Sequence, residues 1–313
     1  MRVCVPAAVL VLSFLPLSAF AGDWTQFRGP GGLGVSDEKS TPVKWSSTEN
    51  IAWQVELPGP GASCPIAVKD RVYLTCYTGY GLEGNVGEQK DLRRHLLCFE
   101  RGTGKVLWKK EFEPKLPEHQ YQGEGAYHGY AASTPATDGE RLYVFFGKSG
   151  VYCFDLDGKE LWHVSVGEGL NGWGSGCSPI LHGGLLIINA SIESGSLVAL
   201  DKLTGAEVWR QKDIRSAWNT PVVVAGKERA ELIVSTEPRL LSFDANDGRP
   251  LWNADGVCRP RRSRVRDRRR TYVGGRALWR IGRRDGIAHG VARGEGLQRR
   301  FADLPRRTSL LGA

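Results

Sequence analysis

The segment Leu197–Trp209 reads LVALDKLTGAEVW, and three further segments of the chain repeat its pattern. In each segment a glycine lies four residues before a tryptophan, and an acid lies three or four residues before that glycine. The other three segments are Leu96–Trp108, Val151–Trp162 and Leu240–Trp252. The intervals between successive tryptophans are 54, 47 and 43 residues. A recurrence at this spacing indicates one structural unit used several times along the chain.

Each copy predicts a pair of strands joined by a tight turn. Apolar residues alternate before the acid, which is typical of a strand. The acid caps the turn and the glycine supplies its positive φ, after which a second strand ends on the tryptophan. The acids are Glu100, Asp155, Asp201 and Asp244, and the glycines are Gly104, Gly158, Gly205 and Gly248.

A proline signal precedes every copy and predicts two more strands for each unit. The four signals are Ser63-Cys64-Pro65, Ser133-Thr134-Pro135, Cys177-Ser178-Pro179 and Asn219-Thr220-Pro221. Each is followed by a turn and an apolar run, such as Arg141–Gly147 or Gly184–Ala190. Four strands at this period are the signature of a β-propeller blade.

The repeated tryptophans suit the junctions between blades. One blade cannot bury both of its faces, so neighbouring blades must stack around an axis. We expect Trp108, Trp162, Trp209 and Trp252 to fill the gaps between blades while each indole N–H finds a backbone carbonyl. The alternative is that they are ordinary core residues of a β-sandwich, which the recurring glycine and acid make less favourable.

These repeats resemble the pyrroloquinoline-quinone (PQQ) type of β-propeller repeat. The resemblance covers residues 45–256, and an earlier, degenerate copy lies around Trp53. The opening Asp23–Ser36, DWTQFRGPGGLGVS, is similar to the mature N-terminus of exported propellers of this group, especially the planctomycete type. Members generally build eight blades. The resemblance therefore implies an all-β fold, an incomplete propeller of about four four-stranded blades.

The N-terminus predicts export. Arg2 precedes an apolar run from Val3 to Leu17, and Ala19-Phe20-Ala21 offers a small-x-small cleavage site. We interpret residues 1–21 as a signal peptide and residues 22–256 as the partial propeller. The apolar run is too short for a membrane span, so we expect an exported protein of the periplasm or cell envelope.

Residues 257–313 form a compositionally different tail. From Arg259 onward there are 17 arginines, no lysine and 4 acids, whereas residues 1–258 carry a net charge of −5. The repeat pattern stops between Asp255 and Arg259, and RVRDRR stands where the next proline signal is due. Three interpretations compete: a shifted reading frame, which we favour, a disordered tail, and a basic arm. Only a genuine arm would predict a nucleic-acid partner.

Cysteines and histidines give weak signals. Cys98, Cys153 and Cys177 read as small buried strand residues, while a Cys64–Cys76 bridge stays open. A metal site would need His119 and His128 with Glu118 and Glu124, a spacing typical of no known cage. No metal ligand is predicted.

Two functions share the fold that the resemblance implies. A quinoprotein dehydrogenase would oxidise alcohols or sugars with PQQ and Ca²⁺, but its adjacent Cys-Cys pair is missing and no catalytic residue can be assigned. We favour a binding scaffold of the envelope, similar to the outer-membrane protein assembly factor of this fold (BamB-like), with other envelope proteins as partners and no cofactor. The dehydrogenase, with PQQ and Ca²⁺, remains the alternative.

Long glycine-rich connections are the candidate binding elements. They are Tyr77–His95 and Glu113–Ala132, and loops held on a rigid scaffold commonly carry binding sites. Tyr121, Tyr127 and Tyr130 could supply contacts to a partner, or could merely cover the edge of a blade. Asn171 and Trp173 could line the central channel, although a tight turn explains them equally well.

Overall fold

The computed structural model describes residues 22–39, 41–81, 87–121, 128–215 and 217–255, together with the backbone of 309–312. The expected signal peptide, Tyr127, Glu124 and the tail from 256 to 308 lie outside these residues. Apart from three short 3₁₀ turns, the regular structure described is all β. Four sheets have four antiparallel strands each, and strands follow one another in chain order within every sheet.

The four sheets correspond to the four repeats, and we number them as blades 1 to 4. Blade 1 contains β2 (Ile66–Val68), β3 (Arg71–Thr78), β4 (Arg93–Glu100) and β5 (Val106–Phe112). Blade 2 contains β6 (Ala136–Thr137), β7 (Arg141–Phe145), β8 (Val151–Asp155) and β9 (Glu160–Val164). Blade 3 contains β10 (Ile180–His182), β11 (Leu185–Ala190), β12 (Ser196–Asp201) and β13 (Glu207–Gln211). Blade 4 contains β14 (Val222–Ala225), β15 (Ala230–Ser235), β16 (Arg239–Asp244) and β17 (Pro250–Asp255).

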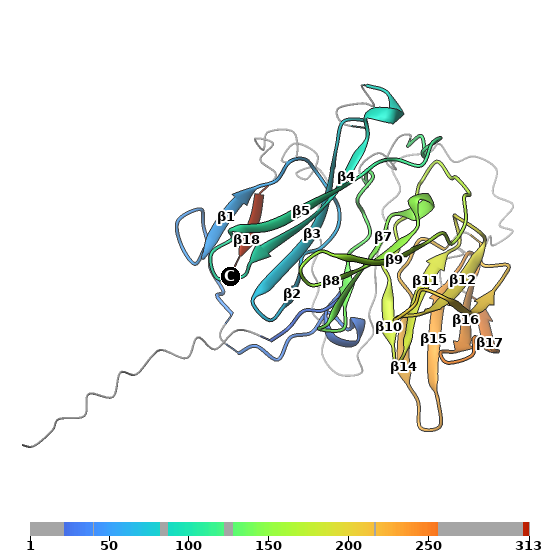
Figure 1. Cartoon of the computed structure of the whole chain (residues 1–313). Coiled ribbons are helices and arrows are strands. Elements are labelled where there is room, and N and C mark those ends of the chain that lie inside the picture. The colour runs from blue at the N-terminus through green and yellow to red at the C-terminus, as the bar shows by residue number, and fades with distance from the viewer. Residues whose placement is uncertain are drawn as a thin grey trace, which may run out of the picture.

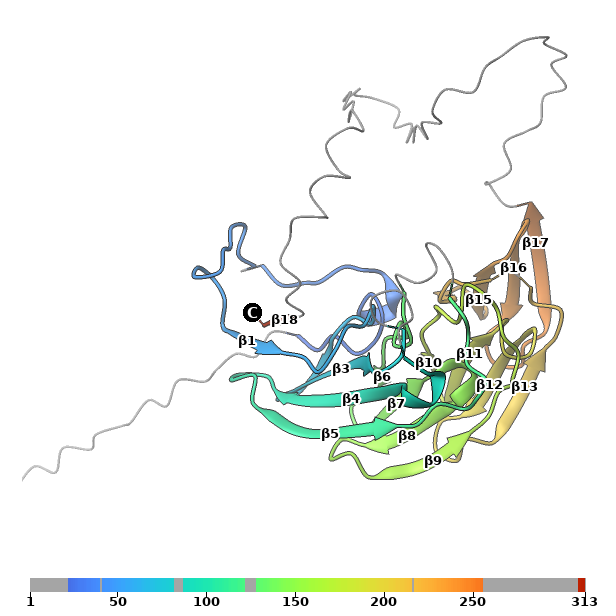
Figure 2. The same cartoon turned by 90° about the horizontal axis from the view of Figure 1, so that it is seen from above.

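The blades stand side by side in a curved row (Figures 1 and 2). Their first strands lie toward the concave side and their fourth strands toward the convex side, as Figure 2 shows. In each blade the pairing of the third and fourth strands is interrupted by an irregularity at the same repeat position, for example between Ala199 and Leu200. The predicted fold is therefore confirmed as a β-propeller, and the described blades leave its ring open.

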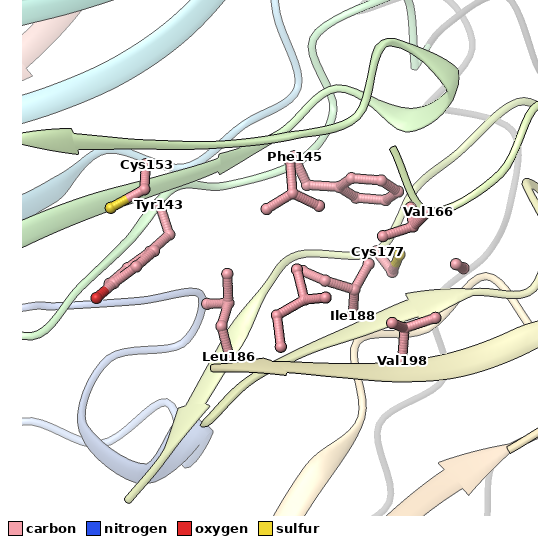
Figure 3. Close-up of a cluster of buried hydrophobic side chains, with 11 residues drawn as sticks. Tyr143, Phe145, Cys153, Val166, Cys177, Leu186, Ile188 and Val198 are labelled. Carbon is pink, nitrogen blue, oxygen red and sulfur yellow. The ribbon is translucent and has the colours of Figure 1, made fainter. Parts of the chain in front are cut away.

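Apolar clusters between successive blades form the core. Between blades 2 and 3, for example, Tyr143, Phe145 and Cys153 face Leu186 and Ile188 (Figure 3). Similar clusters lie between blades 1 and 2 and between blades 3 and 4. Blade 3 is covered on both faces, because one cluster joins it to blade 2 and another joins it to blade 4.

The repeated tryptophan and glycine meet across these junctions. The indole N–H of Trp162 donates to the carbonyl of Lys202 at 3.2 Å, in the turn of the next blade. A methyl group on Gly205 of that turn would come within 2.8 Å of the Trp162 ring, so the close contact itself requires glycine. Trp53 and Trp108 donate in the same way to Arg101 and Leu156, at 2.7 and 3.2 Å.

The last two tryptophans depart from this scheme. Trp209 packs on Gly248, but its buried indole N–H has no acceptor among the described residues. Trp252 instead donates to Glu231 of its own blade at 2.7 Å, and its ring is 41% exposed. No further blade is described beyond β17 to receive it, which explains the different partner.

Three 3₁₀ turns and two further strands complete the described structure. The turns are η1 (Pro30–Gly32), η2 (Gln89–Asp91) and η4 (Gly147–Ser149). Beside blade 1, β1 (Trp53–Glu56) pairs antiparallel with β18 (Ser309–Gly312), so the one described part of the tail is a strand. Within the described residues there is no helix long and apolar enough to cross a membrane.

Candidate functional site

The long connections gather at one end of the blades, which we call the loop face. In an antiparallel meander alternate connections lie at the same end of a sheet. The connections from β3 to β4, from β5 to β6 and from β9 to β10 therefore share this end. The short turns that carry the repeated acids lie at the opposite end. For example, Asp201 accepts the N–H groups of Leu203 and Thr204 there, at 3.0 and 2.8 Å.

Two of the predicted tyrosines lie inside the loop face. Tyr121 and Tyr130 are buried with their ring centroids 4.6 Å apart, in a cluster that also contains Tyr77, Tyr80 and Leu92. Their rings thus pack the connections against each other. This burial raises the pKa of the Tyr121 and Tyr130 hydroxyls well above the ordinary value.

A buried ion pair joins three elements beneath these tyrosines. Arg94 of β4 donates to Glu118 at 2.8 Å, and both side chains are almost inaccessible. The same guanidinium donates to the Tyr130 carbonyl at 2.9 Å and to Ser149 Oγ at 3.2 Å. Arg94 therefore fixes the β5–β6 connection and η4 to the first blade. Losing either charge of such a pair would leave the other buried and uncompensated.

His119 links the β5–β6 connection to the connection between β9 and β10. Its Nδ1 lies 3.1 Å from both the backbone nitrogen and the backbone carbonyl oxygen of Asn171, and its own carbonyl accepts the Tyr130 hydroxyl. Burial lowers the pKa of His119, which favours the neutral imidazole. Asn171 Oδ1 in turn accepts the N–H of Trp173 at 2.9 Å. Tyr121, Tyr130 and Asn171 are thus brought together around His119.

Trp173 is the exposed end of this chain of contacts. Its side chain is 51% exposed, although its backbone is held by Asn171. That Asn171 and Trp173 line a central channel stays a prediction; the hydrogen bond between them is the kind that a tight turn makes. Trp173 offers an aromatic surface on the outside of the loop face.

A second buried acid, Glu193, lies in the turn between β11 and β12. One carboxylate oxygen accepts the Ser175 hydroxyl, and the other has no partner among the described residues. Burial raises the pKa of Glu193 to about 7. A nearby cavity of about 20 Å³, lined in part by Arg94, His119 and Ser175, is large enough for one water molecule. The sequence analysis did not identify Arg94 or Glu193. For Arg94 a signal was available, because Arg93 and Arg94 are two consecutive arginines at the start of an otherwise apolar strand.

A chain of hydroxyl groups runs from blade to blade beneath the loop face. Thr134 Oγ1 accepts the N–H of Cys64, Ser178 Oγ accepts the N–H of Thr134, and Thr220 Oγ1 accepts the N–H of Ser178. The distances are 2.9, 3.0 and 2.9 Å. These residues are the ones before the proline in each predicted signal. The hydroxyl thus satisfies an amide of the preceding blade, a role that the sequence pattern did not reveal.

The acids and histidines considered from the sequence do not gather around one point among the described residues. In these ranges no three His, Cys, Asp or Glu side chains are placed to hold one ion, and His119 bonds Asn171 instead. The candidate ligand Glu118 is engaged by Arg94, His128 is exposed and Glu124 is not described. Cys64 and Cys76 are free thiols, as are Cys98, Cys153 and Cys177, so the bridge considered between the first two is absent.

Fold and site together define an open β-propeller of PQQ-type repeats with a rigidly supported loop face. The sequence profile of the family described as outer membrane protein assembly factor BamB matches residues 92–271, more than half of the chain. The chain belongs to this family.

Individual relatives match over shorter stretches. The outer membrane protein assembly factor BamB of Yersinia pestis is 26% identical over 147 residues, which is 45% of this chain and 37% of the relative. The BamB of Salmonella typhimurium is 36% identical over 74 residues, covering 22% of this chain and 19% of the relative. The matches therefore span well under half the length of these relatives.

A likeness to solved structures supports the fold alone. The quinohemoprotein alcohol dehydrogenase of Comamonas testosteroni aligns with 74% of this chain and 41% of its own, at 14% identity and a TM-score of 0.52. An identity this low carries no information about the reaction.

Proposed function

We propose that the protein is an exported scaffold of the cell envelope that binds other envelope proteins through its loop face. The observation that carries the proposal is the contrast at Trp173, a half-exposed indole on a connection whose supports are buried and hydrogen-bonded. Tryptophan is enriched at the energetic centres of protein interfaces. Membership in a family described as an outer-membrane protein assembly factor supports the same class of partner.

The rigidity of the support favours binding. Partners lose less free energy when the contact surface is already ordered before they meet. The Arg94–Glu118 pair and the His119–Asn171 contact provide that order without occupying the exposed surface. A loop face built in this way can present a fixed aromatic surface to a partner.

Site-specific photo-crosslinking tests the proposal. A photoreactive phenylalanine replaces Trp173 in one variant and Leu203 in a matched control, since both side chains are 51% exposed. Leu203 lies in the β12–β13 turn, at the end of the blades opposite the loop face. In envelope preparations, we expect discrete crosslinked envelope proteins from position 173 and none from position 203. Equal crosslinking at the two positions, or none at 173, would contradict the proposal.

An activity assay separates the scaffold from the dehydrogenase. The protein is supplied with PQQ and Ca²⁺, and dye reduction is followed with simple alcohols and sugars. A binding scaffold gives no reduction above the protein-free control. Substrate-dependent turnover would make the dehydrogenase the correct function.

A further inference from the structure

An N-terminal segment crosses the inner edges of the first two blades. Trp24 exchanges two backbone hydrogen bonds with Ala67 of β2, at 2.8 and 2.9 Å. The next residue, Thr25, accepts the N–H of Thr137 at the end of β6, at 2.8 Å. Figure 2 shows this segment on the concave side of the blades. Residues 23–25 thus lie as an extended peptide across β2 and β6.

The backbone position that binds this segment, which we call the seat, recurs in blades 3 and 4. Ala67 and Thr137 are each the second residue after the repeat proline, and Leu181 and Val223 occupy that position in the later blades. In the register, Ala67 lies opposite Val72, and Val223 lies opposite Leu232 in the same way. The backbone N–H and C=O of Ala67 point away from β3 to reach Trp24. Repeat symmetry directs the corresponding groups of Leu181 and Val223 away from their sheets as well.

A cavity of about 540 Å³ lies where these two seats face the N-terminal segment. Leu181 and Val223 contribute to one wall, and Gln26, Phe27 and Arg28 contribute to the other. No backbone hydrogen bond from outside the sheets reaches Leu181 or Val223 within the described part of the chain. The volume is within the range of ordinary ligand-binding sites.

We propose that this cavity binds an extended peptide segment of a partner protein through the backbone groups of Leu181 and Val223. The chain's own Trp24 and Thr25 show how such a peptide is held in blades 1 and 2. Recognition of this kind uses main-chain hydrogen bonds for affinity, as in the addition of a strand to a sheet edge. The exposed Arg28 in the cavity wall favours a peptide that carries an acidic residue. The chain's own segment has such a residue, Asp23, next to Trp24. The proposal rests on the scaffold function and specifies the chemistry of one partner.

The probe is a synthetic peptide with the sequence of residues 22–27, GDWTQF, carrying a fluorophore, and its binding is followed by anisotropy with the full chain. Val223→Pro removes one N–H that faces the cavity. Proline is tolerated at such a position because no bond of the sheet is lost. We expect three- to tenfold weaker binding, the effect of one backbone hydrogen bond. The matched control Val223→Ala keeps the N–H and should bind as the unaltered protein does.

A second probe leaves the protein unchanged. Methylation of the backbone nitrogen of the peptide's tryptophan removes the donor that Trp24 uses toward Ala67, and should weaken binding by a similar factor. Absence of binding, or equal binding of both peptides and of the proline variant, would overturn the proposal. Crosslinking at position 173 is measured separately. If the peptide does not bind but position 173 still crosslinks to envelope proteins, the peptide site is wrong and the scaffold function stands.

Discussion

At the scale of single residues, the buried Arg94 charge stabilises the loop face. Replacing Arg94 with methionine leaves Glu118 buried without its partner, which costs about 3–5 kcal/mol of unfolding free energy. Arg249→Met is the control, because its partners Asp244 and Asp247 are reached only at 3.8 and 3.9 Å from an exposed side chain. That change should cost no more than about 1 kcal/mol. Urea unfolding measures both, and a double replacement of Arg94 by methionine and Glu118 by leucine should recover much of the loss.

Glu193 predicts a dependence of stability on pH. Its pKa is raised to about 7 in the folded protein, above the value of about 4.3 in an unfolded chain. The folded state therefore binds more protons between these values, so this contribution to stability is complete below about pH 4 and is lost as pH rises through 7. The loss amounts to about 4 kcal/mol at most. Glu193→Gln should flatten the unfolding free energy measured between pH 5 and 8; parallel curves for the two proteins would contradict this.

The residues of the site divide by how local their roles are. The acid and glycine of each turn could be read from the sequence because the cap and its amides lie within four residues, as for Asp201. The partners Arg94 and Glu118 are 24 positions apart, and His119 and Asn171 are 52 apart. The spacing of these residues in the sequence does not predict either contact, because both contacts depend on how the long connections fold.

At the scale of elements, the junction of Trp162 with Gly205 can be tested by adding one methyl group. Gly205→Ala would place its Cβ 2.8 Å from the Trp162 ring at a φ of 74°, whereas at Gly183 the φ is 55° and nothing lies within 4 Å. Gly183→Ala should cost about 1 kcal/mol from the backbone alone. We expect the loss at Gly205 to exceed it by about 1–3 kcal/mol through overpacking. Thermal unfolding compares the pair, and equal losses would show that the tryptophan does not require glycine.

The strands themselves were largely predictable. Alternating apolar residues and turn glycines recur in every repeat, so each copy reports on the others, and the four blades follow from that recurrence. The connections do not repeat in length or sequence, and their contacts could be found only from the structure. The segment around Trp24 shows the difference: its resemblance to exported propellers said nothing of its seat on β2.

At the scale of the whole molecule, blade 4 presents an open face. Trp252 is 41% exposed and Val224 is 46% exposed on this blade. Exposed apolar faces and unpaired sheet edges favour association. We expect the protein to associate at high concentration, and we expect Trp252→Lys to reduce this association in sedimentation experiments more than Trp173→Lys on the loop face does. An unchanged association for Trp252→Lys would show that this face is not the one that joins molecules.

Two kinds of hydrogen bond between blades have the same direction along the chain, with the donor in one blade and the acceptor in the next. The hydroxyls of Thr134, Ser178 and Thr220 each accept an N–H from the blade before. The indoles of Trp108 and Trp162 each donate to a carbonyl of the blade after. These donors of a blade therefore find their acceptors only once the next blade has folded. Since a polypeptide leaves the ribosome N-terminus first, the blade most recently made is always the unfinished one. The propeller therefore gains order from its N-terminus toward its C-terminus, because each new repeat supplies hydrogen-bond acceptors to the repeat synthesised before it.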